Sequence, residues 1–259
     1  MKNILTTYPL GGNAITGMTK QQAGNFSLSQ PETCQGLVFA SEVFSLLRGE
    51  HTSISRKRVF VMDARDHTGK VPFWNLEKSL HAQRVCDGVI WSHEGIALCF
   101  PGGCPVLTFV NEKTGLLGML HCSWKTIGQR IITNFATQWQ FFGGCPETTS
   151  IRFLPAICGH CLTFDQPYWE KKVSPALRWT GQEPQDFIVA RDDLIGLDLF
   201  RLSAAILAKC GYTRIETDGV CTSCSNEYWD YRHHDSKESG GQKYRNAAFL
   251  YAESLPHLA

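Results

Sequence analysis

The strongest periodic signal in the chain is a helical one between residues 124 and 142. Apolar side chains recur there every three or four residues, at Trp124, Ile127, Ile131, Phe135, Trp139 and Phe142. This spacing places them on one face of an α-helix, which Gly143 and Gly144 would end. Similar patterns cover residues 34–48, before Gly49, and residues 197–209, before Gly211. The pattern therefore predicts three amphipathic helices.

Short apolar runs separated by glycine-containing turns predict strands, and most of them follow one another without an intervening helix. They cover residues 59–62, 89–91, 96–100, 106–110, 116–120, 151–157, 213–217 and 247–251. Consecutive strands favour an α+β fold, with mixed β-sheets flanked by helices, over a doubly wound parallel sheet. Residues 171–186 are polar and hold two prolines, which predicts a surface connection. Residues 221–245 form a long polar and aromatic stretch, and such loops are often functional.

Composition limits the classes of function that remain open. The 259 residues are 43% hydrophobic and 19% charged, an ordinary globular balance, and we expect a single domain over residues 1–259 because no linker-like stretch divides them. The net charge of +1 provides no general attraction to nucleic acid or to a membrane. No apolar run is long enough to span a bilayer, and residues 1–10 lack the apolar core of a signal peptide. A cytoplasmic location is the expectation.

The chain holds eleven cysteines, an odd number that cannot pair completely within one molecule. A reducing compartment would keep them as thiols, some of which could bind metal. Two CxxC pairs occur, Cys158-Gly159-His160-Cys161 and Cys221-Thr222-Ser223-Cys224. They lie much farther apart than the pairs of a zinc ribbon. They could form a structural four-cysteine zinc site, or they could be free thiols.

Three other residues suggest a metal site with an open coordination position. His67 follows the strand predicted at 59–62, Cys104 precedes the one at 106–110, and His121 follows the one at 116–120. If the latter two strands form an antiparallel hairpin, Cys104 and His121 lie at the same end of the sheet. Imidazole and thiolate ligands suit zinc, and three ligands leave room for a water. The alternative is a buried core cysteine and two ordinary histidines, because the spacing matches no local zinc motif.

Several short motifs, in a fixed order, resemble one known family. Cys86-Asp87-Gly88 resembles its Ala-Asp-Ala, Cys104-Pro105-Val106-Leu107 its Asp-Cys-x-Pro-Val-Leu, and His121-Cys122-Ser123-Trp124-Lys125 its His-Ala-Gly-Trp-Arg. Further along, Ala156-Ile157-Cys158-Gly159 resembles Ala-Ile-Gly-Pro, Cys221-Thr222 matches Cys-Thr, and Tyr228-Trp229-Asp230-Tyr231-Arg232 resembles Phe-Phe-Ser-Tyr-Arg. Weaker similarities to the family motifs occur at Asp66-His67, at Arg245-Asn246-Ala247-Ala248, and at Gly11-Gly12 with residues 25–28. Together they resemble the YfiH-like, laccase-domain (multicopper polyphenol oxidase) family.

The resemblance implies a fold of mixed sheets flanked by helices and a zinc or copper site formed by His67, Cys104 and His121. It implies a metalloenzyme whose small-molecule substrates are a purine nucleoside and phosphate, acting by phosphorolysis or by adenosine deamination. Lys125, Tyr231, Arg232 and Arg245 would bind the substrate, with no nucleic acid or membrane as partner. A hydrolase (amidase) that edits peptidoglycan precursors is the alternative that the family also implies. A catalytically divergent metal-binding homologue is the third possibility.

The sequence departs from the family motifs at four places. Gly103 replaces the Asp before the cysteine, and the residue between Cys104 and Pro105 is absent. Lys125 replaces an arginine and cannot form its bidentate fork, and Cys158-Gly159 replaces Gly-Pro. Loss of a carboxylate near a ligand can weaken metal binding, so altered substrate or reduced activity is part of the prediction. His233-His234-Asp235 is a further candidate general base, or simply a solvated polar run.

Overall fold

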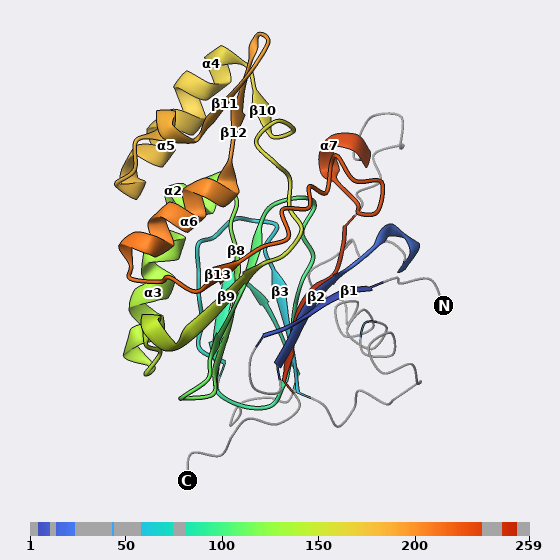
Figure 1. Cartoon of the computed structure of the whole chain (residues 1–259), viewed down its shortest axis with the longest axis vertical. Coiled ribbons are helices and arrows are strands. Elements are labelled where there is room, and N and C mark those ends of the chain that lie inside the picture. Colours follow the sequence, from blue (N-terminus) through green and yellow to red (C-terminus); the bar gives the residue numbers. More distant parts are fainter. Residues whose placement is uncertain are drawn as a thin grey trace.

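The computed structural model describes residues 5–10, 14–23, 43, 58–74, 81–234 and 245–252. Within them the chain forms three sheets, with helices against one face of the second sheet and beside the third (Figure 1). Of the helix expected at 34–48, only Val43 is described, and the motif residues 11–12 and 25–28 lie outside the described part. Among the described residues, no helix has the length and apolar character needed to cross a bilayer.

The largest sheet has six strands and brings both ends of the described chain together. Its order is β1 (Leu5–Pro9), β2 (Ala14–Thr19), β14 (Ala248–Ala252), β6 (Gly95–Cys99), β3 (Val59–Asp63) and β4 (His81–Val85). β3 runs parallel to β4 and β6, whereas the other neighbours are antiparallel. The sheet is therefore mixed, as the sequence predicts.

The second sheet has five strands and carries the predicted hairpin. Its order is β13 (Ile215–Glu216), β9 (Thr149–Phe153), β7 (Val106–Asn111), β8 (Leu116–His121) and β5 (Gly88–Trp91). β7 and β8 pair antiparallel, with Val106 opposite His121. A third, small sheet contains β10 (Thr163–Phe164), β12 (Leu194–Leu197) and β11 (Ile188–Arg191).

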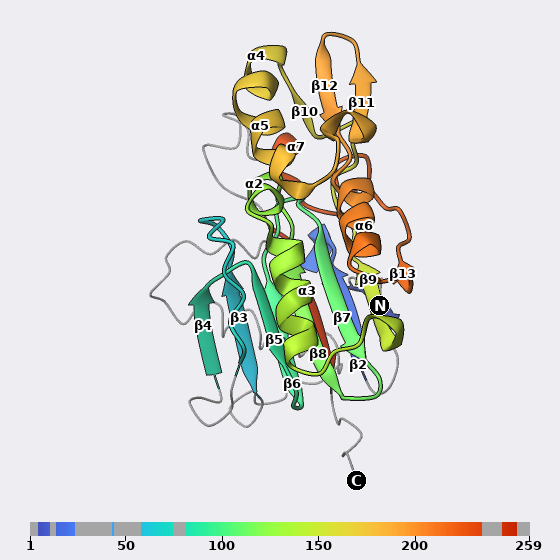
Figure 2. The ribbon, with the colours of Figure 1, turned by 90° about the vertical axis from the view of Figure 1, so that its left-hand side faces the viewer.

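Alternating side chains of the five-stranded sheet enter two separate cores. In β7, Val106 and Val110 join the cluster between the two large sheets, whereas Leu107 and Phe109 join the cluster beneath the helices. The strand is apolar on both faces because both are covered. Figure 2 shows α3 (Ile131–Phe141) and α6 (Leu199–Lys209) lying across the outer face of this sheet. The predicted α+β class, with helices outside mixed sheets, is confirmed.

The helix predicted over residues 124–142 is two helices, so that prediction was wrong in its continuity. α2 (Trp124–Gly128) is followed by a break at Arg130, which has φ +62°, and α3 begins at Ile131. A residue in the left-handed region cannot continue an α-helix. The apolar period survives the break, since Ile127, Ile131 and Phe135 still enter one core.

Other predicted boundaries shift for local reasons. The helix predicted from residue 197 begins at Leu199, because Asp198 accepts a hydrogen bond from the Arg201 backbone N–H (2.9 Å) as its N-cap, and Leu197 ends β12. The strand predicted over 151–157 ends at Phe153.

The polar stretch 171–186 is not a plain surface connection. It lies within a series of short helical turns in which Trp169, Val173 and Leu177 are buried. The turns are α4 (Gln166–Tyr168), the π-helix η4 (Trp169–Val173), α5 (Ser174–Leu177), and the 3-10 helices η5 (Arg178–Thr180) and η6 (Pro184–Phe187). Outside this region lie two further 3-10 turns, η1 (Gln21–Ala23) and η3 (Pro146–Thr148), and the single turn α7 (Tyr231–His234).

Phe135 tests the contact between helix and sheet. Its ring lies 4.4 Å from that of Phe109, and it packs over Gly118, where a Cβ atom would come within 2.6 Å of the ring. We expect Phe135→Ala to lower the free energy of unfolding by about 3–5 kcal/mol in denaturant titrations, because it leaves a cavity. Phe141 lies in the same helix but is 80% exposed, so Phe141→Ala is the control and should change stability by less than about 0.5 kcal/mol. Equal losses in both variants would contradict this packing.

Candidate functional site

The hairpin of β7 and β8 positions Cys104 and His121 at one end of the five-stranded sheet. The pairing continues past the strands, since Cys122 donates its backbone N–H to the Pro105 carbonyl (2.8 Å). The His121 N–H donates to the Asp87 carbonyl at 2.7 Å, which joins the start of β5 to the same end. Cys104 precedes β7 by two residues and lines the pocket that His121 also lines. The hairpin therefore brings Cys104 and His121 to the same end of the sheet, as the sequence predicts.

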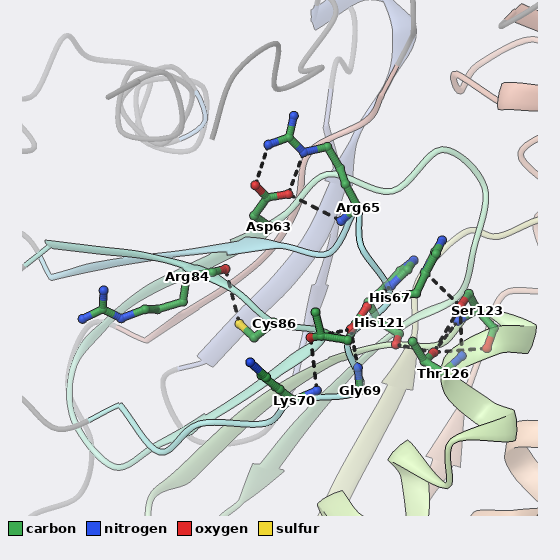
Figure 3. Close-up of polar contacts among 12 residues, drawn as sticks. Asp63, Arg65, His67, Gly69, Lys70, Arg84, Cys86, His121, Ser123 and Thr126 are labelled. Atoms are coloured by element: carbon green, nitrogen blue, oxygen red, sulfur yellow. Dashed lines mark hydrogen bonds and ion pairs between the residues drawn. The ribbon is translucent and has the colours of Figure 1, made fainter. Parts of the chain in front are cut away.

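His67 reaches the same place from the other sheet. It lies in the turn after β3, where its φ is +50°. Its ring stacks on that of His121, with centroids 5.7 Å apart and planes 18° from parallel. Ser123 Oγ hydrogen-bonds His67 Nδ1 at 3.1 Å, and the same serine caps α2 by accepting from the Thr126 N–H (Figure 3). The residue that starts α2 thus also orients His67.

Asp87 is the third member of the group and was not among the site residues expected from the sequence. Its carboxylate is fully buried, and Oδ1 lies 3.1 Å from His121 Nδ1. Oδ2 accepts from the Gly69 N–H at 2.8 Å and from Thr68 Oγ1 at 3.3 Å. Ligand atoms of His67, Asp87 and His121 all lie within 4.8 Å of one another, which is compatible with one metal ion. Cys104 is not in that group, although its side chain interacts with His121.

The two histidines have opposite electrostatic environments. Burial alone lowers the pKa of His121, but hydrogen bonds to Asp87 and Cys104 outweigh it and raise that pKa to about 9. Burial, and next the nearby His121 and Lys125, lower the pKa of His67 to about 4. At neutral pH and without metal, His67 is neutral and His121 carries the proton. A metal bound through both rings must displace that proton.

One cavity of about 660 Å³ is lined by His67, Cys104 and His121, and by all the substrate-binding residues expected from the sequence. Its cationic lining consists of Arg65, Lys125, Arg232 and Arg245, and its aromatic lining of Phe100, Trp124, Phe164, Tyr168 and Tyr231. Arg65 forms a bidentate pair with Asp63, at 2.7 Å through Nε and 2.6 Å through a terminal nitrogen (Figure 3). Asp63 and Asp165 are also in the lining, so beyond the Arg65–Asp63 pair the pocket combines aromatic rings with three cations and one carboxylate.

A buried aspartate holds Tyr231 and Arg232 against this cavity. Asp230 Oδ1 accepts the Arg232 backbone N–H at 2.9 Å, and Oδ2 accepts from Thr222 Oγ1 at 2.8 Å. Tyr231 donates its N–H to the Gly102 carbonyl (2.8 Å), so α7 is joined to the turn before β7. Arg232 Nε donates to the Tyr231 hydroxyl at 2.7 Å, with its guanidinium 5.6 Å from the Phe164 ring.

Gly103 and Asp230 share one small space. Gly103 has φ +125°, and a Cβ atom there would lie 2.4 Å from Asp230 Oδ2. The family motif has aspartate at the position of Gly103 and serine at that of Asp230. In this chain the Asp230 carboxylate occupies the space beside Gly103, where it accepts hydrogen bonds from Thr222 Oγ1 and the Arg232 N–H.

His233 and His234 belong to the backbone of α7, but their side chains, like residue 235, lie outside what the structure describes. The general-base role predicted for them stays a prediction. Asp87 and Asp230 were quoted only as parts of motifs. A sequence signal for Asp87 did exist, namely an aspartate between two small residues just before a buried strand.

Comparisons with known proteins give one family model that matches the sequence and several solved structures that share the fold. The family model described as "Multi-copper polyphenol oxidoreductase laccase" matches residues 46–249. No curated protein matches the sequence. The crystal structure of a Bacillus licheniformis hypothetical protein, YfiH, is similar with TM-score 0.73 and 16% identity over 93% of each chain. YlmD from Geobacillus stearothermophilus gives TM-score 0.75 and 18% identity, covering 95% of this chain and 94% of that one. A Neisseria meningitidis protein of the DUF152 family gives TM-score 0.75 and 15% identity, covering 97% and 100%.

Gly103→Ala tests the arrangement around Asp230. The substitution places a methyl group against the buried carboxylate and adds backbone strain of about 1–3 kcal/mol. Displacing Asp230 adds the loss of a charged hydrogen bond, about 1.5–3 kcal/mol. Gly181→Ala is the control, because Gly181 also has positive φ (+70°) but nothing within 4 Å of a Cβ. We expect Gly103→Ala to lower the unfolding free energy clearly more than the control, and limited proteolysis near α7 to accelerate in that variant alone. Equal behaviour of the two variants would contradict the proposed contact.

Proposed function

The chain belongs to the multi-copper polyphenol oxidoreductase laccase family, whose members include YfiH-like proteins, and from this premise we propose that it is a metal-dependent enzyme acting on purine nucleosides. The observation that carries the proposal is the coincidence of two features in one cavity of about 660 Å³. The metal-capable histidines His67 and His121 line it together with several aromatic and cationic side chains. Pockets for small ligands commonly have this size and this mixture of groups.

The donor set fits a transition metal such as zinc, with copper as the alternative. His121 is bonded through Nδ1 to the buried Asp87, the usual arrangement of a metal-binding histidine with a carboxylate behind it. His67 is neutral at pH 7, so its ring nitrogen needs no deprotonation to bind metal. Cys104 would add a thiolate, giving two imidazoles and one sulfur, a set that suits zinc and copper. When bound, the ion would act as a Lewis acid or lower the pKa of a bound water.

A single ion agrees better with this group than a multicopper cluster does. Among the described residues, one set of clustered metal-capable side chains includes histidine, and it offers three residues. A cluster of several coppers needs more imidazoles than that. We therefore infer the substrate from the residues that line the pocket and not from the term laccase in the family name.

The chain's own residues can hold a nucleoside and an anion at once. Trp124, Phe164 and Tyr168 offer ring faces for a purine base, since aromatic rings stack readily on bases. Arg232 uses Nε to hold Tyr231, which leaves the terminal nitrogens of its guanidinium to bind phosphate. Burial raises the pKa of Tyr231, so its hydroxyl keeps a proton that it can donate to a ribose oxygen or to phosphate. Lys125 adds a second positive charge near the histidines.

Substrate assays with matched variants test the proposal. We expect the metal-loaded protein to convert inosine with phosphate, or to deaminate adenosine. We expect His121→Ala to lower kcat/KM at least about 100-fold, or about 2.7 kcal/mol. His93, in the turn at the opposite end of β5 from Asp87, supplies the control His93→Ala. Hydrolysis of a nucleotide-linked muropeptide in place of nucleoside turnover would replace the proposal by the amidase alternative. Metal-loaded protein inactive on all three substrates would indicate a divergent, non-catalytic homologue.

Asp87→Asn tests the role of the buried carboxylate without removing a ring. The amide keeps the shape of the side chain but loses its charge, so His121 is held less firmly and becomes a weaker ligand. We expect metal affinity to fall roughly 10–100-fold in competition titrations with a chelator. Asp193→Asn, at an exposed position in the turn between β11 and β12, should leave it unchanged. Unchanged affinity in Asp87→Asn would exclude Asp87 from the metal site.

A further inference from the structure

The two CxxC pairs, sixty residues apart in sequence, meet in space outside the cavity described above. Sulfur atoms of Cys158, Cys161, Cys221 and Cys224 all lie within 4.8 Å of one another. Cys161 Sγ is 3.3 Å and Cys158 Sγ is 3.9 Å from Cys224 Sγ. A Zn–S bond of about 2.3 Å implies sulfur separations of ~3.8 Å in a tetrahedron. The observed separations bracket that value, and the shorter one exceeds the ~2.05 Å of a disulfide.

Backbone contacts hold the two pairs in this arrangement. Ala156 and Cys221 form a parallel β-bridge, and the Thr222 N–H donates to the Ala156 carbonyl at 3.1 Å. Cys158 and Cys224 each donate a backbone N–H to Cys221 Sγ, at 3.2 and 3.3 Å. Such bonds favour the thiolate, which is the metal-binding form of cysteine. Cys158, Cys161 and Cys221 are half-buried and Cys224 is exposed, so an ion can enter from solvent.

We propose that Cys158, Cys161, Cys221 and Cys224 bind one structural zinc ion. Four sulfurs with no other donor form a closed tetrahedral set, typical of structural and not of catalytic zinc. The site is separate from the group of His67, Asp87 and His121 and does not depend on the proposed activity.

The position of the cluster gives the ion a role in the pocket. Cys161 is followed directly by Leu162, Thr163 and Phe164, and Cys224 by the segment that ends in Tyr231 and Arg232. Residues from both segments line the cavity (Figure 1 shows β10 and α7, to which they lead). Zinc would therefore join two walls of the pocket that are otherwise connected by few backbone hydrogen bonds. Its loss should loosen both walls and leave the two large sheets intact.

Metal analysis of purified full-length protein, kept reduced, tests the proposal. The background is the double variant His67→Ala/His121→Ala, so that any remaining metal belongs to the cysteines. We expect one zinc per chain in this background, and its loss on adding Cys161→Ser or Cys224→Ser. Cys145→Ser is the matched control, since Cys145 is exposed and its thiol contacts Glu147. The control should retain the zinc. Limited proteolysis should cleave the segment around 221–232 at least about tenfold faster in the two cluster variants.

A second measurement covers the case in which a cluster variant fails to fold. Cobalt-loaded background protein should show the strong thiolate-to-metal charge transfer of a tetrahedral four-sulfur site. Absence of that absorption, zinc retained by Cys224→Ser, or a Cys161–Cys224 disulfide in protein kept reduced would each overturn the proposal. Failure of the nucleoside assays would leave this zinc in place, so the two proposals fail separately.

Discussion

The buried carboxylate of Asp87 is the interaction on which the geometry of the pocket depends. A charge removed from water is tolerated only when hydrogen bonds and an opposite charge compensate it. Asp87 obtains these from two other segments: the His121 ring at the end of β8, and the Gly69 backbone N–H and Thr68 hydroxyl in the segment after β3. Satisfying one carboxylate therefore brings the turn after β3, the start of β5 and the end of β8 to a common point. The stacking of His67 on His121 follows from that convergence.

The rest of the pocket is built from segments that the sheets do not position directly. Asp230 is a second fully buried carboxylate, and its hydrogen bonds position Tyr231 and Arg232 in the same way. It accepts from Thr222 and from the backbone of Arg232, and so fixes a single turn of helix that would not be stable alone. Two of the four clustered cysteines, Cys221 and Cys224, flank Thr222 in the same segment. In our proposals one metal acts within the cavity and another holds its boundary in place.

The structure gives each departure from the family motifs a different explanation. Gly103 is favoured by its backbone conformation and by the Asp230 carboxylate, which leaves no room for a Cβ atom there. Cys158 in place of glycine is one of the four clustered sulfurs. Lys125 remains at the cavity as a charge, although it lacks the fork of an arginine. These changes describe a divergent pocket in which positive charge and metal-capable groups are retained.

The sequence by itself determined the fold class, most strands of the two large sheets and the hairpin that joins Cys104 to His121, because apolar periodicity records which faces are buried; the interior strand β2 was not predicted. It also identified the family, through short motifs in a fixed order. It could not show that Arg130 interrupts the helix, since the apolar period continues across the break. The edge strands β1, β4 and β11 were not predicted for a different reason, namely that their apolar pattern is weak. Only the tertiary structure decided that Asp87 supports His121 and that the two CxxC pairs meet. Such contacts join residues that are distant in the chain, and local sequence carries no record of which distant partner satisfies a buried charge or a thiol.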